Sequence, residues 1–222
     1  MTCRPRIAVL NPNATRAMTE AMVAAMRAAL GDGATVLGLT NEGGPPAIQG
    51  EADGAAALPG LRALFDAALR DGAQAVVVGC FDDTGLDELR ARRAAPAIGL
   101  GEAGCLLAGL SAPRFGVVTT LAVSVPVIER NVQAMGLAPR CVGVRASGVP
   151  VLELEANADR VAAAFAALRA EAPGCAVVLG CAGMTAIADR LRAAVPGPLI
   201  DPVTAAGALA VAAAGQATPA AT

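Results

Sequence analysis

The sequence predicts an α/β fold made of two similar parallel-sheet halves, with the expected site in the cleft between them. Two observations carry this prediction. Short apolar runs alternate with longer helical stretches along the 222 residues, which is typical of a parallel sheet covered by helices. Three segments also occur twice in the same order, which indicates an internal repeat. With 55% hydrophobic residues, the chain can bury a sizeable core.

Eight apolar runs are predicted as β-strands. Each run is short, is rich in Val, Ile, Leu or Ala, and is bounded by polar or turn-forming residues. The runs cover residues 7–10, 35–39, 75–78, 97–100, 116–119, 141–144, 176–179 and 199–200.

The longer stretches between these runs predict helices. Their alanine-rich sequences, with Arg and Glu on one side, are expected to pack on the faces of the sheets. Thr15 is predicted to cap the first helix, and Thr120 or Ser124 to cap the helix after the fifth strand. The predicted helices cover residues 15–30, 58–71, 84–93, 102–110, 122–135, 155–171, 184–194 and 203–214.

The repeated segments share nearly the same spacing. They are Arg6–Asn11 and Arg114–Thr119 (114 − 6 = 108), the Gly-Cys strands that end at Cys80 and Cys181 (181 − 80 = 101), and Pro96–Gly101 and Pro198–Val203 (198 − 96 = 102). We therefore predict a first half at residues 1–110, a second half at residues 111–214 and a loose tail at residues 215–222. Two such halves are expected to bring the Gly-Cys edges face to face.

Composition narrows the possible partners. The net charge is −2, the positive charges are all Arg and are scattered, and aromatic residues make up 2%, which argues against nucleic-acid binding. No run approaches the ~18 apolar residues of a membrane-spanning helix, and no secretory signal is expected. Six cysteines without a CxxC pair indicate a reducing, cytoplasmic setting. We expect a small-molecule substrate.

The chain contains no His, Lys, Tyr or Trp, so few side chains can move a proton near neutral pH. Cys80 and Cys181 each follow a Gly at the carboxyl end of a buried strand, where open α/β sheets bind ligands. The N–H groups and helix N-termini after them are expected to favour a thiolate. Packing alone would explain one such cysteine, but the repeat favours a functional pair. The other four are predicted to be structural: Cys3, Cys105, Cys141 and Cys175.

Several motifs resemble the hydantoin racemase branch of the Asp/Glu racemase superfamily. They are Ile7–Thr15 with Met18-Thr19, Cys80–Leu86, Phe115–Thr120 with Ser124–Pro126, Gly180–Met184 and Ile200–Pro202. The resemblance extends from about residue 6 to residue 212 and keeps the motif order. It implies racemisation without a metal or other cofactor. One cysteine thiolate would remove the α-proton, and the other thiol would deliver a proton to the opposite face of the stereocentre.

The resemblance implies a cyclic ureide as substrate, either a 5-substituted hydantoin or allantoin. We predict eight substrate-binding residues around the cysteines: Asn11, Asn13, Ile48, Phe81, Thr119, Thr120, Ala182 and Gly183. A turn beside Pro12 is the alternative for both Asn residues, and a helix cap for both Thr residues. We also expect a homo-oligomer.

Four alternative functions stay open: an amino-acid racemase, an arylmalonate decarboxylase, a maleate isomerase and a non-catalytic ureide-binding protein. Decarboxylases of this group use one cysteine, in the second half, so Cys80 argues against that branch.

Three further features receive structural explanations. Asp82 and Asp83 resemble paired acid–base carboxylates, but charge beside Cys80 would raise its pKa, so we predict that they cap the helix that follows. Gly99–Gly104 matches the dinucleotide-binding pattern G-x-G-x-x-G, yet no acidic residue follows about 20 positions later. The available Cys and carboxylate residues have no spacing that a zinc site uses.

The chain also departs from the family pattern in two loops. Members usually carry a Gly-Pro-Ala-Ser-Ile-Glu-Gly type of segment with a nearby His, whereas this chain differs at Pro46, Gln49 and Glu51. Thr84 stands where a Pro is common. These loops are expected to cover the substrate, so the departures bear on the identity of the substrate more than on the chemistry.

Overall fold

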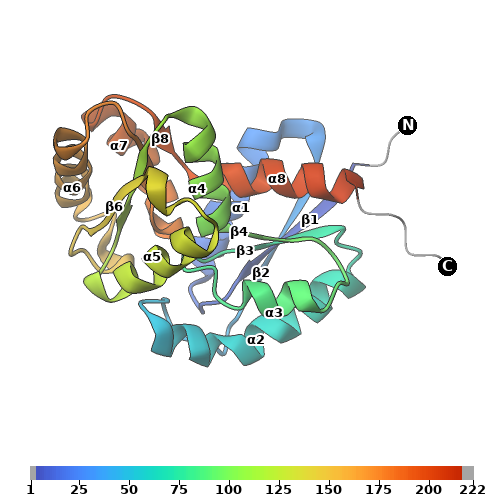
Figure 1. Cartoon of the computed structure of the whole chain (residues 1–222). Helices are drawn as coiled ribbons and strands as arrows, with labels where there is room; N and C mark the ends of the chain where they lie inside the picture. Colours follow the sequence, from blue (N-terminus) through green and yellow to red (C-terminus); the bar gives the residue numbers. More distant parts are fainter. Residues whose placement is uncertain (1–3, 217–222) are drawn as a thin grey trace.

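The computed structural model describes residues 4–216, which form two four-stranded parallel sheets (Figure 1). The first has the strand order β2-β1-β3-β4 and the second the order β6-β5-β7-β8. The strands are β1 (Arg6–Asn11), β2 (Thr35–Thr40), β3 (Ala75–Val78), β4 (Ala97–Gly99), β5 (Phe115–Thr119), β6 (Cys141–Ala146), β7 (Ala176–Leu179) and β8 (Leu199–Ile200). All eight lie where the sequence predicts them. The equivalent order of the two sheets confirms an α/β fold with two similar parallel-sheet halves.

Eight α-helices lie between and after these strands in the described part of the chain. They are α1 (Arg16–Leu30), α2 (Glu51–Arg70), α3 (Leu86–Ala91), α4 (Leu100–Ser111), α5 (Val125–Ala134), α6 (Ala158–Glu171), α7 (Ala188–Ala194) and α8 (Pro202–Gln216). Each overlaps a predicted helix. Short 3-10 segments adjoin several of them, and the one at Ala182–Ile187 directly follows Cys181.

Helix α2 differs most from its prediction, because it begins at Glu51 rather than at residue 58. The added turns contain Gly54, and Pro59 and Gly60 follow within the predicted part, yet the helix is continuous. Gly60 leaves room for the side chain of Asn41, whose Oδ1 would lie 1.9 Å from a Cβ at that position. Asn41 Nδ2 also donates to the carbonyl of Ala57 at 3.3 Å. A tertiary contact therefore outweighs the poor local helix propensity.

The predicted side-chain caps are wrong for Thr15 and Ser124. Both residues occupy N-cap positions, of α1 and α5 respectively, but neither side chain caps its own helix. Thr15 Oγ1 instead donates to the carbonyl of Pro46 at 2.7 Å. Ser124 Oγ donates to Asp82 Oδ2 at 3.3 Å. The two hydroxyls hold neighbouring loops in place rather than helix ends.

Two helices pack on the sheet of the other half. Helix α4 follows β4, but its Cys105 belongs to a buried cluster with Phe115 of β5 and Val178 of β7. Helix α8 follows β8, but it packs beside α1 and the first sheet (Figure 1), with Val203 and Ile7 in one buried cluster. Each sheet therefore completes its core with a helix from the other half, which fixes the two carboxyl edges relative to each other. The division at residue 110 stays a prediction.

The ends of the chain add little to this picture. Gly215 and Gln216, from the predicted tail, are the last residues of α8, and residues 217–222 lie outside the described residues. Cys3 also lies outside them. Within residues 4–216, no helix is both long enough and apolar enough to cross a membrane.

Candidate active site

The two Gly-Cys segments leave their sheets in the same way. Gly79 N donates to the Leu10 carbonyl at 2.8 Å, and Gly180 N donates to the Val118 carbonyl at the same distance. Both acceptors lie at the carboxyl ends of central strands, β1 and β5. Glycine is required at Gly180, because the chain passes close to the backbone of the neighbouring strand there. A Cβ on Gly180 would lie 2.5 Å from the Val118 carbonyl oxygen. This close approach places Cys80 and Cys181 at equivalent points of the two halves.

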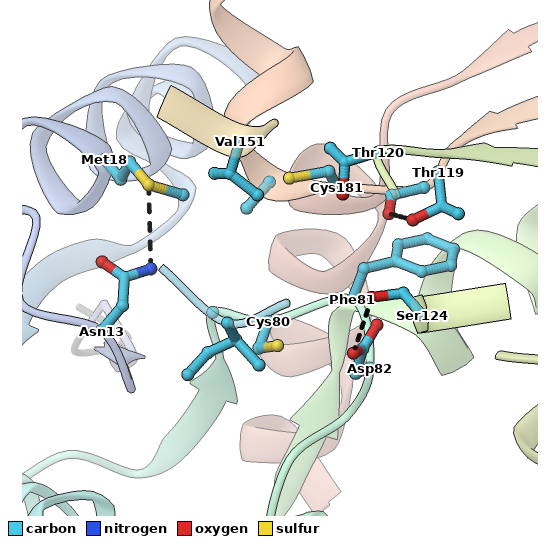
Figure 2. Close-up of a pocket in the computed structure, with 14 residues that line it drawn as sticks. Asn13, Met18, Cys80, Phe81, Asp82, Thr119, Thr120, Ser124, Val151 and Cys181 are labelled. Carbon is cyan, nitrogen blue, oxygen red and sulfur yellow. Dashed lines mark hydrogen bonds between the residues drawn. The ribbon is translucent and has the colours of Figure 1, made fainter. Parts of the chain in front are cut away.

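Both cysteines line one pocket at the carboxyl edges of the two sheets (Figure 2). The space between the side chains is narrow, with room for about one water molecule (about 20 Å³). Of the ten predicted site residues, eight line this pocket: Asn13, Ile48, Cys80, Phe81, Thr119, Thr120, Cys181 and Ala182. Six lining residues were missing from the predicted set: Met18, Gly79, Asp82, Ser124, Val151 and Gly180.

Two predicted residues, Asn11 and Gly183, lie outside the pocket lining. Asn11 is fully buried behind the pocket, where its Nδ2 donates to Asn13 Oδ1 at 3.0 Å and to Thr19 Oγ1 at 2.9 Å. Asn11 therefore holds Asn13 in position, while Asn13 itself reaches the pocket. Among the described residues, Asn13 Nδ2 has only the sulfur of Met18 as a partner, at 3.7 Å (Figure 2). This amide is available to donate to a bound carbonyl group.

Two of the remaining predicted residues are already engaged with the protein. Thr119 Oγ1 donates to the Gly180 carbonyl at 3.0 Å, which links β5 to the Cys181 segment. The ring of Phe81 belongs to the buried cluster that also contains Phe115 and Cys105. Both residues shape the pocket wall by packing as well as by lining it.

Burial raises the pKa of both thiols, contrary to the expected preference for thiolates. For Cys181 the pKa rises to about 11, because burial outweighs the hydrogen bonds from the backbone N–H groups of Gly183 and Met184. For Cys80 burial and then the negative charge of Asp82 raise the pKa further. The N–H groups after Cys181 do favour the thiolate, as predicted, but they are the smaller effect. Both thiols are therefore neutral near pH 7.

Asp82 lines the pocket and does not cap the following helix, so that prediction is wrong. Burial raises its pKa to about 6, and the hydrogen bond from Ser124 works in the opposite direction. Its charge acts on both thiols, because it raises the pKa of Cys80 and of Cys181. None of the described residues that line the pocket is basic. Asp82 is therefore an acceptor facing the pocket without a cationic partner in the lining.

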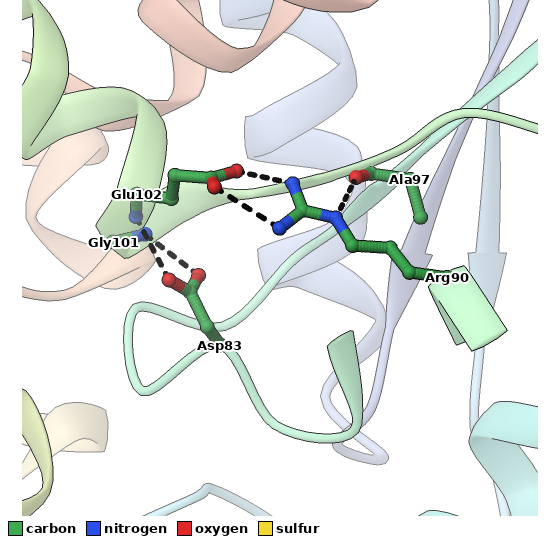
Figure 3. A network of polar contacts seen from close by, with 5 residues as sticks. All are labelled: Asp83, Arg90, Ala97, Gly101 and Glu102. Carbon is green, nitrogen blue, oxygen red and sulfur yellow. Dashed lines mark hydrogen bonds and ion pairs between the residues drawn. The ribbon is translucent and has the colours of Figure 1, made fainter. Parts of the chain in front are cut away.

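Asp83 caps a helix, but it is α4 rather than the helix that follows it. Its carboxylate accepts from Gly101 N at 2.9 Å and from Glu102 N at 2.8 Å, while Arg90 pairs with Glu102 (Figure 3). Burial raises the pKa of Asp83 to about 7. The backbone of Asp83 has a positive φ of 52°. The carboxylate ties the loop after Cys80 to α4, which packs on the sheet that carries Cys181.

This contact also explains the G-x-G-x-x-G pattern. A Cβ at Gly99 would lie 2.2 Å from Asp83 Oδ1, and one at Gly101 would lie 2.3 Å from the Phe81 carbonyl oxygen. A Cβ at Gly104 would lie 2.8 Å from a methyl group of Val178 in β7. The three glycines let the Cys80 loop and the second sheet approach α4. A dinucleotide phosphate would bind at the N-terminus of α4, but the carboxylate of Asp83 occupies that position.

The loop that departs from the family pattern bridges the two halves. Gln49 Oε1 accepts from the backbone N–H of Val151 at 3.1 Å. Glu51, at the start of α2, forms an ion pair with Arg130 of α5. Ile48, between Pro46 and Gln49, lines the pocket. Gln49 and Glu51 thus both make contacts between the two halves.

Thr84, the second departure, reaches the sulfur of Cys80. Its Oγ1 donates to Cys80 Sγ at 3.5 Å, a contact that a proline could not make. The hydroxyl is held beside α2, since Oγ1 lies 3.5 Å from where a Cβ on Gly54 would be. A donor to sulfur stabilises the thiolate, so it lowers the pKa of Cys80 against the effects of burial and Asp82.

We predict that Thr84→Val, which keeps the shape but loses the donor, raises the pKa of Cys80. Alkylation of Cys80 by iodoacetamide, followed by peptide mass spectrometry, should become slower at a given pH and its profile should move to higher pH. Thr84→Ser should restore the wild-type profile, and alkylation of Cys181 should change little. Identical Cys80 profiles for the Val and Ser variants would contradict this role.

Comparisons with known proteins agree with this geometry. A family profile described as Asp/Glu/Hydantoin racemase matches residues 7–210. The hydantoin racemase of Rhizobium meliloti is 39% identical over 206 residues, which cover 90% of this chain and 85% of that protein. The solved allantoin racemase from Klebsiella pneumoniae has a TM-score of 0.86 and 33% identity, covering 94% of this chain and 86% of that one. The solved allantoin racemase from Pseudomonas fluorescens has a TM-score of 0.84 and 30% identity, covering 93% of this chain and 89% of that one.

Proposed function

The chain belongs to the Asp/Glu/hydantoin racemase family and is a racemase, and we propose that it inverts the C5 stereocentre of a hydantoin-type cyclic ureide by a two-cysteine mechanism. One thiolate, Cys80 or Cys181, removes the C5 proton and becomes a thiol. The electron pair moves into the adjacent carbonyl as an enolate. The other thiol then protonates the opposite face of C5 and is left as the thiolate. No cofactor takes part.

The observation that carries this proposal is the equivalence of the two cysteines. Two-sided proton transfer needs two acid–base groups on opposite sides of one carbon. Cys80 and Cys181 follow equivalent strands, β3 and β7, and line the same pocket from the two halves. The chain has no His, Lys or Tyr that would serve instead. The N–H groups of Gly183 and Met184, which face Cys181, are suited to stabilise enolate charge.

The polar groups of the pocket support a cyclic ureide as the substrate. A ureide ring presents both carbonyl acceptors and N–H donors. Asn13 Nδ2 is available to donate to a ring carbonyl, and the carboxylate of Asp82 is available to accept from a ring N–H. A free amino acid would bring a carboxylate next to Asp82, with no basic side chain among the described lining residues to offset the repulsion. A ring carbon beside a carbonyl and a ring nitrogen is also easier to deprotonate than the α-carbon of a free amino acid.

The test uses optical rotation and deuterium uptake together. The purified protein is incubated in deuterated water with one enantiomer of a 5-substituted hydantoin, with allantoin, and with free amino acids, and the uncatalysed rates are subtracted. We expect loss of rotation and C5 deuterium incorporation with a cyclic ureide and neither with the amino acids. Absence of both signals with every ureide would refute the proposal. Racemisation of an amino acid alone would favour the rival amino-acid racemase.

We also propose that the protein works in the cytoplasm as a homo-oligomer. Five free cysteines among the described residues support a reducing setting: Cys80, Cys105, Cys141, Cys175 and Cys181. Leu110 on α4 is 86% exposed, and further leucines on α4 and α8 are partly exposed. Apolar surface of this kind supports contact with a second copy of the chain.

A further inference from the structure

A second cavity lies directly beside the pocket of the two cysteines. It is an open groove between α1 and the segment that follows β6, and it has about 360 Å³ of space, against about 20 Å³ in the pocket. The pocket has room for about one water molecule, so it must widen to take the reacting ring and has no space for a large group attached to that ring. Any sizeable group attached to the ring needs space elsewhere.

The groove and the pocket share part of their walls. Met18, Val151 and Ala182 line both cavities, and Ala182 directly follows Cys181. Met18 and Val151 lie opposite each other at the side of the pocket (Figure 2). Met18 is half-buried and unbranched, so it can change rotamer to open a passage. A group attached to a carbon between the two sulfurs has a short path past these side chains into the groove.

The chemistry of the groove is mostly apolar. Beyond the shared residues its walls include Ala17, Leu154 and Ala186. Gly183 deepens it, since a Cβ there would lie 2.9 Å from Leu154 Cδ1. The acidic side chain at the groove is Glu155, which is exposed. Such a surface suits a hydrocarbon group and disfavours a carboxylate.

We propose that this groove, lined by Ala17, Met18, Val151, Leu154, Ala182 and Ala186, binds an apolar substituent on C5 of the ring. The proposal rests on the proposed function and narrows its substrate class to alkyl- or aryl-substituted hydantoins. Allantoin carries a polar ureido group at the same carbon, and the apolar walls offer that group few hydrogen-bond partners.

The first experiment compares substrates with the wild-type protein. Rates are measured for 5-isobutylhydantoin, 5-benzylhydantoin and allantoin by polarimetry, and for unsubstituted hydantoin by C5 deuterium exchange. We expect kcat/KM for the two apolar hydantoins to exceed that for allantoin at least ~10-fold, the scale of apolar pocket discrimination. Equal or greater kcat/KM for allantoin would overturn the proposal.

The second experiment fills the groove. Ala17 on α1 and Ala186 on the 3-10 segment after Cys181 are exposed and line the groove, so Ala17→Phe and Ala186→Phe occupy the space without entering the core. Each should lower kcat/KM for 5-benzylhydantoin at least ~10-fold relative to the exchange rate of hydantoin, which has no substituent. Ala28→Phe, at another exposed alanine of α1, is the matched control and should leave this ratio unchanged.

The outcomes separate the groove from the reaction itself. If hydantoin exchanges its C5 proton but neither groove variant changes the ratio, the groove assignment fails and the racemase proposal stands. If the wild-type protein exchanges no C5 proton in any ureide, the proposed function fails and the groove proposal fails with it. Allantoin racemisation that both groove variants slow as much as that of 5-benzylhydantoin would also contradict an apolar-specific groove.

Discussion

Serine in place of Cys80 or Cys181 is expected to lower the rate of racemisation at least ~10³-fold, because a hydroxyl is a far weaker acid than a thiol and cannot take over its step. In the proposed mechanism inversion needs both sulfurs, so the two single variants should be about equally inactive. Each variant should still exchange the C5 proton of the one enantiomer that faces its remaining cysteine. Polarimetry measures the first effect, and deuterium exchange of each separate enantiomer measures the second.

The rate of the wild-type protein should rise with pH through the neutral and alkaline range. In the proposed mechanism the base is a thiolate, and burial holds the pKa of Cys181 at about 11 and that of Cys80 above its usual value. For the serine variants of Cys80 and Cys181, the matched control is Cys141→Ser, because Cys141 lies at the start of β6, outside the pocket lining. Full racemisation by a folded Cys80→Ser or Cys181→Ser variant would contradict the two-cysteine mechanism.

Alanine at Gly180 is expected to cost about 3 kcal/mol of unfolding free energy, and alanine at Gly79 only about 1 kcal/mol. A Cβ at Gly180 would meet backbone atoms of β5, at 2.5 Å from the Val118 oxygen and 2.9 Å from Thr119 Cα. A Cβ at Gly79 would mainly meet the end of the Met22 side chain, at 2.8 Å from Cε, with the Leu10 oxygen at 3.1 Å. A flexible side chain can move aside, whereas a strand backbone cannot.

Urea unfolding measured by circular dichroism tests this difference. Gly33→Ala serves as the control, because a Cβ at that position meets nothing within 4 Å and its φ is not positive. This variant should match or slightly exceed wild-type stability. If Gly180→Ala and Gly79→Ala lose the same free energy, the close approach of the Cys181 segment to β5 is not what demands the glycine.

Sequence reasoning predicted the elements that depend on local pattern. Short apolar runs and their repeat gave all eight strands and the equivalence of Cys80 and Cys181. The sequence-based predictions were wrong where a side chain forms a hydrogen bond with a residue that is distant in the sequence. Asp83 was expected to cap the next helix, yet it caps α4, about 18 residues further along the chain. No local signal distinguishes the two helices, because the partner is chosen by how the loop folds back.

The same limit applies to the residues around the cysteines. Asn11 and Asn13 are alike in sequence, and only the packed structure shows that Asn13 faces the pocket while Asn11 supports it. Asp82 and Asp83 are also alike in sequence, but Asp82 lines the pocket whereas Asp83 accepts hydrogen bonds from the start of α4. Val151 carries no sequence signal for a site, and Met18 occurs in a family motif that does not by itself show that its side chain faces the pocket. Their role as a shared wall arises only when α1 meets the segment after β6.

The sequence by itself determined the α/β fold and its two-fold repeat, and it predicted the two thiols as the proton-transfer groups. These follow from hydrophobic periodicity and from the absence of His, Lys and Tyr, which are properties of the chain alone. Only the tertiary structure decided that burial keeps both thiols neutral, that Asp82 faces them and that a groove adjoins their pocket. The physical reason is that desolvation, the proximity of charges and the shape of a cavity all depend on distances between segments that are far apart in the sequence. Helices α4 and α8 set these distances, because each packs on the sheet of the other half.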